Sequence, residues 1–286
     1  MPAAVVAIIL IPMPKPDFKS RSLKEKPEQG IFILPGGIIL PDGTRYQVVK
    51  LRQLTGREEE MILDAEADNN NNNNNITALL TQILTNCIES IGPLKEINSD
   101  IVRQLLICDR DYLLLKLRQI TFGDRIDAQV QCPNESCRKP MHIDFDLKSI
   151  EVQRKNIGNG VYSLRLSPMA SYKDSNNDSN VKQTDIEFRL PNVADQEEIA
   201  EVLYKEKKNE SKALTKLLRR CLIRVGSISE IDENLIYSLP MLARREIDLK
   251  MQEYSPKVDL RIHIQCPHCT MDYTSPFDLQ NFFLAK

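Results

Sequence analysis

Four of the seven cysteines in this chain lie in two short motifs, each of which begins with Gln-Cys-Pro. Cys132 is followed by Cys137, and Cys266 is followed by Cys269. Each motif offers two thiolates, whereas a structural zinc ion takes four ligands in a tetrahedron. Either motif alone therefore supplies half of a site. The two motifs together predict one four-cysteine site for Zn²⁺ of the zinc-ribbon type.

Two other interpretations of these cysteines remain open from the sequence. Two separate half-sites could be completed by His142 and His268, which lie close to the motifs, or by another chain. The motifs could also be eroded and hold no metal. Cysteines with metal-type spacing in a chain of 286 residues are typical of a reducing compartment and not of a disulfide framework.

A β-hairpin must carry each cysteine motif. Apolar and polar residues alternate before each Gln-Cys-Pro, with the apolar positions at Ile126, Ala128 and Val130 in the first motif and at Leu260, Ile262 and Ile264 in the second. A period of two is typical of a half-buried strand, and the proline-bearing loop is where the chain reverses. The two hairpins are expected to pair as a zinc-ribbon-like unit.

Landmarks recur along the chain at a nearly constant offset of about 134 positions, which indicates an internal duplication. The pairs are Cys132 and Cys266, Cys87 and Cys221, Gly92 and Gly226, Arg110 and Arg244, Ala78-Leu79 and Ala213-Leu214, Glu58-Glu59 and Glu197-Glu198, and Asp146-Leu147 and Asp278-Leu279. The predicted fold class is α+β. Each copy is expected to hold a β-hairpin, several helices and a cysteine-bearing β-hairpin.

The duplication sets the domain boundaries. Residues 1–29 are predicted to form an extended arm and linker, residues 30–148 the first copy, residues 149–160 a connector and residues 161–286 the second copy. The arm begins with an apolar run of nine residues, Ala3 to Ile11, which is too short to span a bilayer. We expect this arm and the apolar tail around Phe282 to contact other subunits.

The helices of each copy follow from three- and four-residue apolar spacing. One amphipathic helix is predicted over residues 76–91 and another over residues 211–225. Cys87 and Cys221 lie on the apolar stripes, which favours buried structural thiols. The later helical region of the second copy is interrupted at Pro240, which predicts a divergence between the copies.

Charged residues near the predicted helices have a functional and a structural interpretation. Glu58 and Glu59 could be a carboxylate pair for acid–base chemistry, but helix capping after Thr55 is favoured because no histidine or nucleophile is near in sequence. Arg110 and Arg118 border an apolar helix. Pairing with carboxylates or solvent is favoured for them over contact with a partner subunit.

Composition and motifs exclude several classes of function. Lys and Arg number 38 and Asp and Glu number 40, giving a net charge of −2, whereas a general nucleic-acid binder carries a basic field. The sequence has no nucleotide-binding glycine loop and no nucleophile with a base. A zinc ion held by four cysteines has no open position for a reacting water. The sequence therefore predicts a protein that is not an enzyme.

Two strings carry a resemblance to a known family. They are Leu51-Arg-Gln-Leu-Thr-Gly-Arg-Glu-Glu59 and Cys108-Asp-Arg-Asp-Tyr-Leu-Leu-Leu-Lys-Leu-Arg118-Gln-Ile-Thr-Phe-Gly123-Asp124. With the cysteine knuckles, they resemble the baseplate hub protein and hub-assembly chaperone family of T-even-type contractile phages, whose relatives occur in phage-tail-like contractile injection systems. The likeness runs from about Gly30 onward.

The resemblance implies a non-enzymatic role in building a baseplate. The implied partners are other baseplate, hub, spike or tube proteins, with no nucleic acid and no direct membrane insertion. The implied location is the bacterial cytoplasm, within the assembled particle or virion baseplate. Two alternatives stay open: a chaperone that leaves the finished particle, and a zinc-ribbon protein that binds nucleic acid or acts in transcription.

Overall fold

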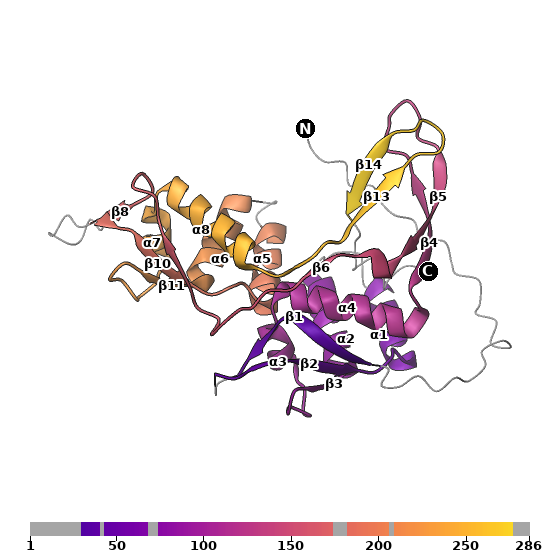
Figure 1. The fold of residues 1–286 in the computed structure, drawn as a ribbon, viewed down its shortest axis with the longest axis horizontal. Coiled ribbons are helices and arrows are strands. Elements are labelled where there is room, and N and C mark those ends of the chain that lie inside the picture. Colours follow the sequence, from indigo (N-terminus) through magenta and orange to yellow (C-terminus); the bar gives the residue numbers. More distant parts are fainter. Residues whose placement is uncertain (1–29, 41–42, 68–73, 174–181, 206–208, 277–286) are drawn as a thin grey trace.

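The computed structural model describes residues 30–40, 43–67, 74–173, 182–205 and 209–276. Within these ranges the chain is a mixed α and β protein with eight α-helices and six small antiparallel sheets (Figure 1). The helices are α1 (Gly56–Ala67), α2 (Asn74–Cys87), α3 (Ser99–Gln104), α4 (Ile107–Phe122), α5 (Val193–Lys205), α6 (Glu210–Cys221), α7 (Glu233–Ser238) and α8 (Met241–Tyr254), with one 3₁₀ helix, η1 (Leu147–Ser149). The strands are β1 (Ile31–Ile39), β2 (Arg45–Leu51), β3 (Ile88–Ile91), β4 (Arg125–Gln131), β5 (Pro140–Asp146), β6 (Val152–Gln153), β7 (Tyr162–Arg165), β8 (Tyr172–Lys173), β9 (Lys182–Gln183), β10 (Asp185–Phe188), β11 (Leu222–Val225), β12 (Lys257–Val258), β13 (Arg261–Gln265) and β14 (Asp272–Pro276).

The first lobe consists of β1 to α4. Its sheet has the order β1-β2-β3, and α4 packs on β1 (Figure 1). Leu34 and Val49 from the sheet, Ile83 from α2 and Leu113 from α4 are fully buried in one core. Leu114 and Leu115 of α4 are also buried, so this helix is enclosed on more than one face, as its unbroken apolar run predicts.

The second lobe consists of β7 to α8 and has its own core. Its sheet has the order β11-β10-β7, with β10 in the middle as β2 is in the first lobe. Both sheets have an irregular register in the same place. Leu51 pairs with Ile88 after a shift in the first, and Phe188 pairs with Leu222 after a shift in the second.

The helices predicted over residues 76–91 and 211–225 end earlier than the sequence pattern indicates. α2 ends at Cys87 and α6 at Cys221, and each chain passes directly into a four-residue strand, β3 or β11. The ends of β3 are Ile88 and Ile91, and both side chains are buried. Apolar residues three positions apart, such as Ile88 and Ile91, fit a helix. However, these side chains are β-branched and lie beside the free edge of β2, which favours a strand.

The helical region of the second lobe is interrupted at Pro240, as the sequence predicts, and the first lobe has a similar break. α7 and α8 are separated there, and α3 and α4 are separated at the same point of the first lobe, around Leu105 and Leu106. The helix before each break is capped by a side chain, Asn98 in the first lobe and Asp232 in the second.

The predicted connector, residues 149–160, contributes to the packing between the lobes. Its strand β6 pairs with β12, which follows α8 (Figure 1). The chain therefore leaves the first lobe and comes back from the second lobe along the same pair of strands. A backbone hydrogen bond from the Val193 N–H to the Leu105 carbonyl also joins the lobes, at 3.0 Å. The two lobes therefore meet along α4, β6, β12 and the start of α5.

A buried carboxylate fixes the bend in β1. Asp109 of α4 is fully buried and accepts hydrogen bonds from the N–H groups of Gly36 and Gly37, at 2.7 and 2.8 Å. A Cβ atom at Gly36 would lie 2.5 Å from a methyl group of Leu106 and 3.0 Å from a carboxylate oxygen of Asp109, so a larger residue there would require these side chains to move. Burial raises the pKa of Asp109 from 3.8 to about 6, against the lowering effect of the two N–H groups.

This raised pKa predicts a pH dependence. Between pH 3.8 and about 6 the folded state binds the proton of Asp109 more tightly than the unfolded state, so the free energy of unfolding falls as pH rises through that window, by roughly 2–3 kcal/mol. Asp109→Asn, measured by urea unfolding at several pH values, should lose this decrease. Asp100→Asn, at a side chain that is 80% exposed, should keep it. An unchanged decrease in the Asp109 variant would contradict the assignment.

Some sequence-based expectations fall on residues outside the described ranges. They are the amino-terminal arm (1–29) and the carboxy-terminal tail (277–286). None of the described helices is long and apolar enough to cross a membrane.

Candidate metal centre

The four motif cysteines lie together, although they come from two hairpins far apart in the sequence. β4 pairs with β5 and β13 pairs with β14, as the alternating pattern predicts, and the two hairpins stand side by side above the first lobe (Figure 1). Cys132 Sγ lies 3.6 Å from Cys269 Sγ, and Cys137 Sγ lies 4.0 Å from Cys266 Sγ. All four sulfur atoms lie within 4.8 Å of one another.

The spacing of the sulfur atoms fits a tetrahedral metal ion. Four thiolates at about 2.3 Å from a central zinc ion have sulfur atoms roughly 3.8 Å apart, which is close to the two shortest separations here. A disulfide bond requires about 2.05 Å, and all four cysteines are free thiols. The cluster could therefore hold one metal ion with all four positions filled by protein.

The two knuckles have the same local geometry. In the first, the residue after the second cysteine is Arg138, with φ of 46°, and in the second it is Thr270, with φ of 57°. The N–H of Cys132 donates to the Lys139 carbonyl at 3.0 Å, and the N–H of Cys266 donates to the Met271 carbonyl at 2.9 Å. A left-handed residue at this point turns the chain back within a short loop, so each loop holds its two sulfur atoms on one side.

The protein shifts the proton affinities of the clustered thiols in opposite directions. Burial raises the pKa of Cys132 to about 12. Burial acts in the same sense on Cys266, but hydrogen bonds from the N–H groups of His268 and Cys269 and from the Cys132 and Cys269 thiols together outweigh it and lower the pKa of the Cys266 thiol to about 6. N–H groups aimed at a sulfur atom stabilise the thiolate form, which is the form that binds metals.

The hairpins are fixed to the first lobe by apolar side chains at their bases. Ile126 and Val130 of β4 and Ile262 and Ile264 of β13 are buried, and they belong to the same core as α4. Cys132 and Cys266 are the buried members of the cluster. The site is thus built on strands that the core already orients.

The two histidines considered as alternative ligands are not part of this cluster. His142 is exposed on β5 and faces Asp127, with 3.7 Å between the closest nitrogen and oxygen atoms. His268 is exposed in the second knuckle. Among the described residues, the group with metal-ligand spacing contains the four cysteines and neither histidine.

A buried ion pair marks the start of the acidic helix in each lobe, and the sequence did not point to its arginine. In the first lobe Arg52 donates two hydrogen bonds to Glu58, at 2.8 and 3.0 Å, and Glu58 also accepts from the Thr55 N–H. In the second lobe Arg189 binds Asp195 in the same bidentate way. Both carboxylates are fully buried. Capping is confirmed for Glu58.

The carboxylate that makes the same bidentate ion pair in the second lobe is Asp195, whereas the sequence offset pairs Glu58-Glu59 with Glu197-Glu198. Glu197 instead accepts a hydrogen bond from Arg103 at 2.8 Å, and Glu198 pairs with Arg220.

The two helix cysteines lie beside these ion pairs. The Cys87 and Cys221 side chains are fully buried, as their place on the apolar stripes predicts. The Cys87 carbonyl accepts from the Arg52 N–H at 2.9 Å, and the Cys221 carbonyl accepts from the Arg189 N–H at 2.9 Å. Burial raises the pKa of each thiol to about 12, so both are structural, unreactive thiols.

Arg110 and Arg118 lie inside the core and not at its border. Their residues are 3% and 7% exposed. Arg110 pairs with Asp111 at 2.6 Å, which agrees with the prediction of a carboxylate partner. Arg118 stacks over the Phe122 ring at 4.4 Å, and burial lowers its pKa to about 10.

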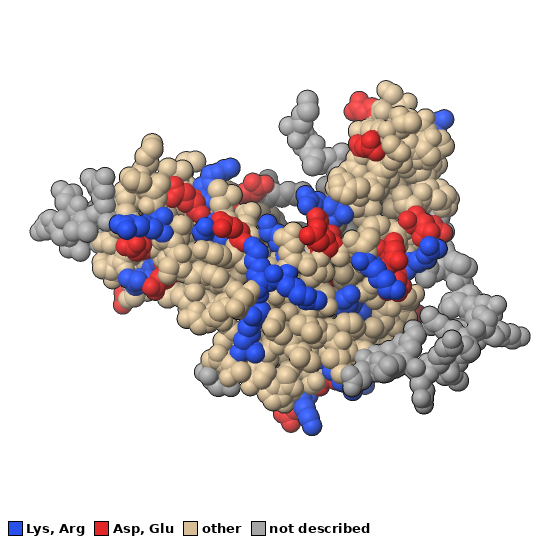
Figure 2. Space-filling model, in the orientation of Figure 1, with Lys and Arg blue, Asp and Glu red and all other residues tan. Residues whose placement is uncertain are grey.

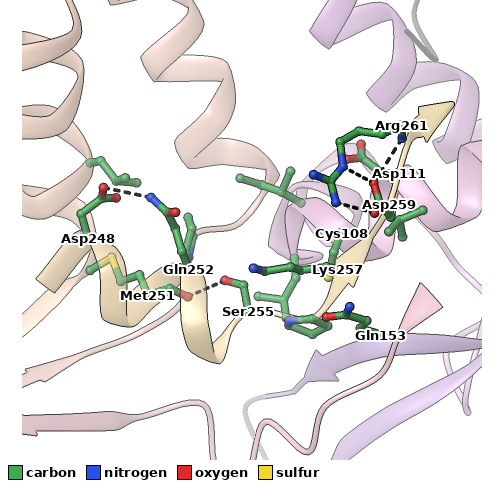
Figure 3. Close-up of a pocket in the computed structure, with 16 residues that line it drawn as sticks. Cys108, Asp111, Gln153, Asp248, Met251, Gln252, Ser255, Lys257, Asp259 and Arg261 are labelled. Carbon is green, nitrogen blue, oxygen red and sulfur yellow. Dashed lines mark hydrogen bonds and ion pairs between the residues drawn. The ribbon is translucent and has the colours of Figure 1, made fainter. Parts of the chain in front are cut away.

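A groove of about 590 Å³ lies where the two lobes meet. Figure 3 shows its two walls, one with Asp111, Asp259 and Arg261 and the other with Asp248 and Gln252 from α8. Asp259 and Arg261 form an ion pair with each other at 2.6 Å. No local sequence pattern predicts this groove, because its lining comes from segments more than a hundred residues apart.

On the face shown in Figure 2, basic and acidic side chains lie near one another. Figure 2 shows Lys and Arg side chains in a line across the middle of this face, where β6 passes the first lobe, with acidic side chains on either side.

Comparison with known proteins adds one positive finding. A family model described as "T4 bacteriophage base plate protein" matches residues 38–284. The match covers both lobes and both cysteine hairpins. No curated protein and no solved structure matches the chain.

Proposed function

The chain belongs to the T4 bacteriophage base plate protein family, and from this premise we propose that it is a structural subunit of the baseplate of a contractile phage tail or of a phage-tail-like contractile injection system. The observation that carries the proposal is a family match over both lobes and both hairpins. The proposed partners are other baseplate, hub, spike or tube proteins. Assembly would take place in the bacterial cytoplasm, where such particles are built.

Retention in the finished particle is favoured by the way the chain is tied together. The two lobes share the β6–β12 pair, and the four cysteines join the hairpin that follows the first lobe to the hairpin that follows the second. Two lobes that are joined at two places keep a fixed arrangement, as a permanent subunit of a rigid assembly requires. An assembly chaperone that leaves the particle is the second candidate within the same family role.

The metal that fits the cysteine cluster best is zinc. Four thiolates in a tetrahedron suit Zn²⁺ or iron–sulfur chemistry, and a single ion with four protein ligands is the usual structural zinc site. Cys132, Cys137, Cys266 and Cys269 would be the ligands. Such an ion would take part in folding and not in a reaction.

The internal duplication is supported by matched contacts and not by sequence offsets alone. Each lobe has an arginine–carboxylate pair at the start of one helix, then a second helix that ends in a buried cysteine, and then a four-residue strand. The residues after each strand also correspond. The Gly92 N–H donates to the Val48 carbonyl at 2.8 Å, and the Gly226 N–H donates to the Asp185 carbonyl at 2.6 Å.

Mass spectrometry of purified sheathed particles tests the role. A structural subunit should be present at a fixed ratio to the spike and tube proteins, and a strain that lacks the gene should form no complete particles. Absence from finished particles, together with failure to assemble in the deletion strain, would instead identify a chaperone. Normal particles in the deletion strain would refute both roles.

A further inference from the structure

We propose that four cations on the first lobe and the connector form a docking surface for an acidic segment of a partner protein. These residues, which we call the cation stripe, are Arg45, Lys116, Arg154 and Lys155. Arg45 opens β2, Lys116 lies on α4, and Arg154 and Lys155 directly follow β6. Figure 2 shows a line of Lys and Arg side chains where β6 passes the first lobe.

The four members of the cation stripe are joined by contacts into one patch. The Arg154 guanidinium and the Lys116 ammonium both lie over the Tyr112 ring, each 5.3 Å from its centroid. Burial lowers the pKa of Lys116, and the positive charge of Arg154 lowers it further. Lys155 follows Arg154 in the chain, and the Lys155 carbonyl accepts a hydrogen bond from Arg45 at 3.0 Å. The fold thus holds like charges together.

Uncharged oxygen atoms hold these side chains in place. Arg45 donates to the Gly36 carbonyl at 2.6 Å, and Arg154 donates to the Ile33 carbonyl at 2.8 Å. The two lysines also donate to uncharged oxygen atoms, those of the Gln119 side chain and the Glu253 backbone. Within the described ranges, no member of the cation stripe has a carboxylate at ion-pair distance. Because an arginine has five N–H donors, each of the two keeps donors for a partner.

Three carboxylates lie close to the cation stripe, and each already has another partner. Asp109 is fully buried and binds two backbone N–H groups of β1. Asp124 pairs with Lys148 at 2.7 Å, and Glu253 pairs with Lys250 at 2.8 Å. The described part of the chain therefore leaves positive charge on this surface that a partner's carboxylates can neutralise.

An acidic protein segment fits the cation stripe better than a nucleic acid does. A nucleic acid carries a charge at every phosphate, and the acidic side chains on either side of the basic line in Figure 2 would repel it. Single-stranded nucleic acids also stack bases on aromatic rings, whereas Tyr112, the ring beneath Lys116 and Arg154, is only 4% exposed. A protein segment can place carboxylates on the stripe and uncharged residues beside it.

Exposed apolar side chains beside the cation stripe give such a segment a second kind of contact. Ile33, whose carbonyl binds Arg154, is 53% exposed. Val48 lies opposite Ile33 on β2 and is 51% exposed. A segment with apolar residues between its carboxylates would contact both the cations and this apolar pair.

Binding of a synthetic acidic peptide to the full-length protein tests the proposal. The probe is a fluorescein-labelled peptide in which glutamate alternates with valine, followed by fluorescence anisotropy at about 0.01 M salt, where the screening length is about 30 Å. The wild type should bind it, and Lys116→Gln combined with Arg154→Gln should raise the Kd roughly tenfold, as for the loss of two exposed ion pairs.

The matched control removes the same charge from cations that already have carboxylate partners. It combines Lys50→Gln with Arg125→Gln, because Lys50 pairs with Glu89 and Arg125 pairs with Asp144. This double variant should bind the peptide as the wild type does. A Kd raised equally by the control would show that only net charge matters, and it would overturn the proposal.

Two further measurements complete the test. No binding of the peptide to the wild type overturns the proposal, and so does tighter binding of a fluorescein-labelled oligothymidylate, which would assign the surface to nucleic acid. If circular dichroism shows that the Lys116 and Arg154 double variant does not fold, carbodiimide cross-linking of the wild type to the peptide carries the comparison. Lys116 and Lys155 should be joined to the peptide in preference to the exposed Lys95 and Lys139, and equal labelling would overturn the proposal. The test uses purified protein and does not depend on the baseplate role.

Discussion

Replacement of Cys266 by serine is expected to remove one zinc ion per chain and to lower the free energy of unfolding by about 4 kcal/mol, the stabilisation given by a ligand at about a thousand times its Kd that binds the folded state alone. The physical reason is that an ion shared by Cys137 and Cys266, which are 129 positions apart, can bind only where folding brings the two hairpins together. Without the ion the folded chain loses that binding free energy, and the three remaining thiols are left without a shared cation. Elemental analysis and guanidinium unfolding measure the two effects.

A single shared ion predicts a result for pairs of cysteine variants that separate half-sites do not. Cys132→Ser and Cys266→Ser should each remove the whole ion, and the double variant should be little worse than either single one, because both changes break the same interaction. Cys108→Ser is the control, since Cys108 is a free cysteine outside the cluster. Additive losses from the two single variants, or a wild-type chain without zinc that a chelator does not destabilise, would refute the shared site.

Replacement of Arg52 by alanine is expected to lower the free energy of unfolding by about 3 kcal/mol, because it leaves a buried carboxylate without its cation. Glu58 is fully buried and its two shortest contacts to a cation are with Arg52. Lys50→Ala on the same strand is the matched control. It breaks a pair with Glu89 in which both side chains are about half exposed, so a loss under about 1 kcal/mol is expected.

The pH dependence identifies the mechanism of that loss. The hydrogen bonds from Arg52 lower the pKa of Glu58 from 4.5 to about 2. A group with a lowered folded pKa contributes stability that is complete above pH 4.5 and is lost as pH falls toward 2. The Arg52→Ala chain should lack this acid-side loss. If it lost stability in acid as steeply as the wild type, packing of the arginine stem and not its charge would explain the destabilisation.

The two cysteine hairpins, and the clustering of their four cysteines, could be predicted from the sequence. The strands follow from a local pattern, and the clustering follows from the number of ligands that a zinc ion needs. Alternation before Cys132 and Cys266 marks the strands, and two half-sites require each other to complete a tetrahedron. The four sulfur atoms do lie together. The buried thiols Cys87 and Cys221 followed from helical spacing in the same way.

Other features depend on contacts that no local pattern records. The passage from α2 into β3 at Ile88 requires the open edge of β2, which only the fold supplies. The bidentate partners of Glu58 and Asp195 are arginines at strand ends, where a lone charged residue carries no periodic signal. The role of Asp109 could not be predicted from the sequence either, because Asp109 accepts hydrogen bonds from two backbone N–H groups more than seventy residues away.

The position of the four cysteines also decides how the molecule carries a pulling load. Cys137 and Cys266 bracket the entire second lobe, so a metal ion between them would link the two hairpins directly. Tension applied at the two ends of the chain would then pass through the sulfur–metal bonds and bypass the second lobe. The 129 positions inside the bracket represent roughly 450 Å of extended chain that would stay slack until the ion is lost. In a machine that works by contraction, such a bypass would spare half of the subunit from being stretched.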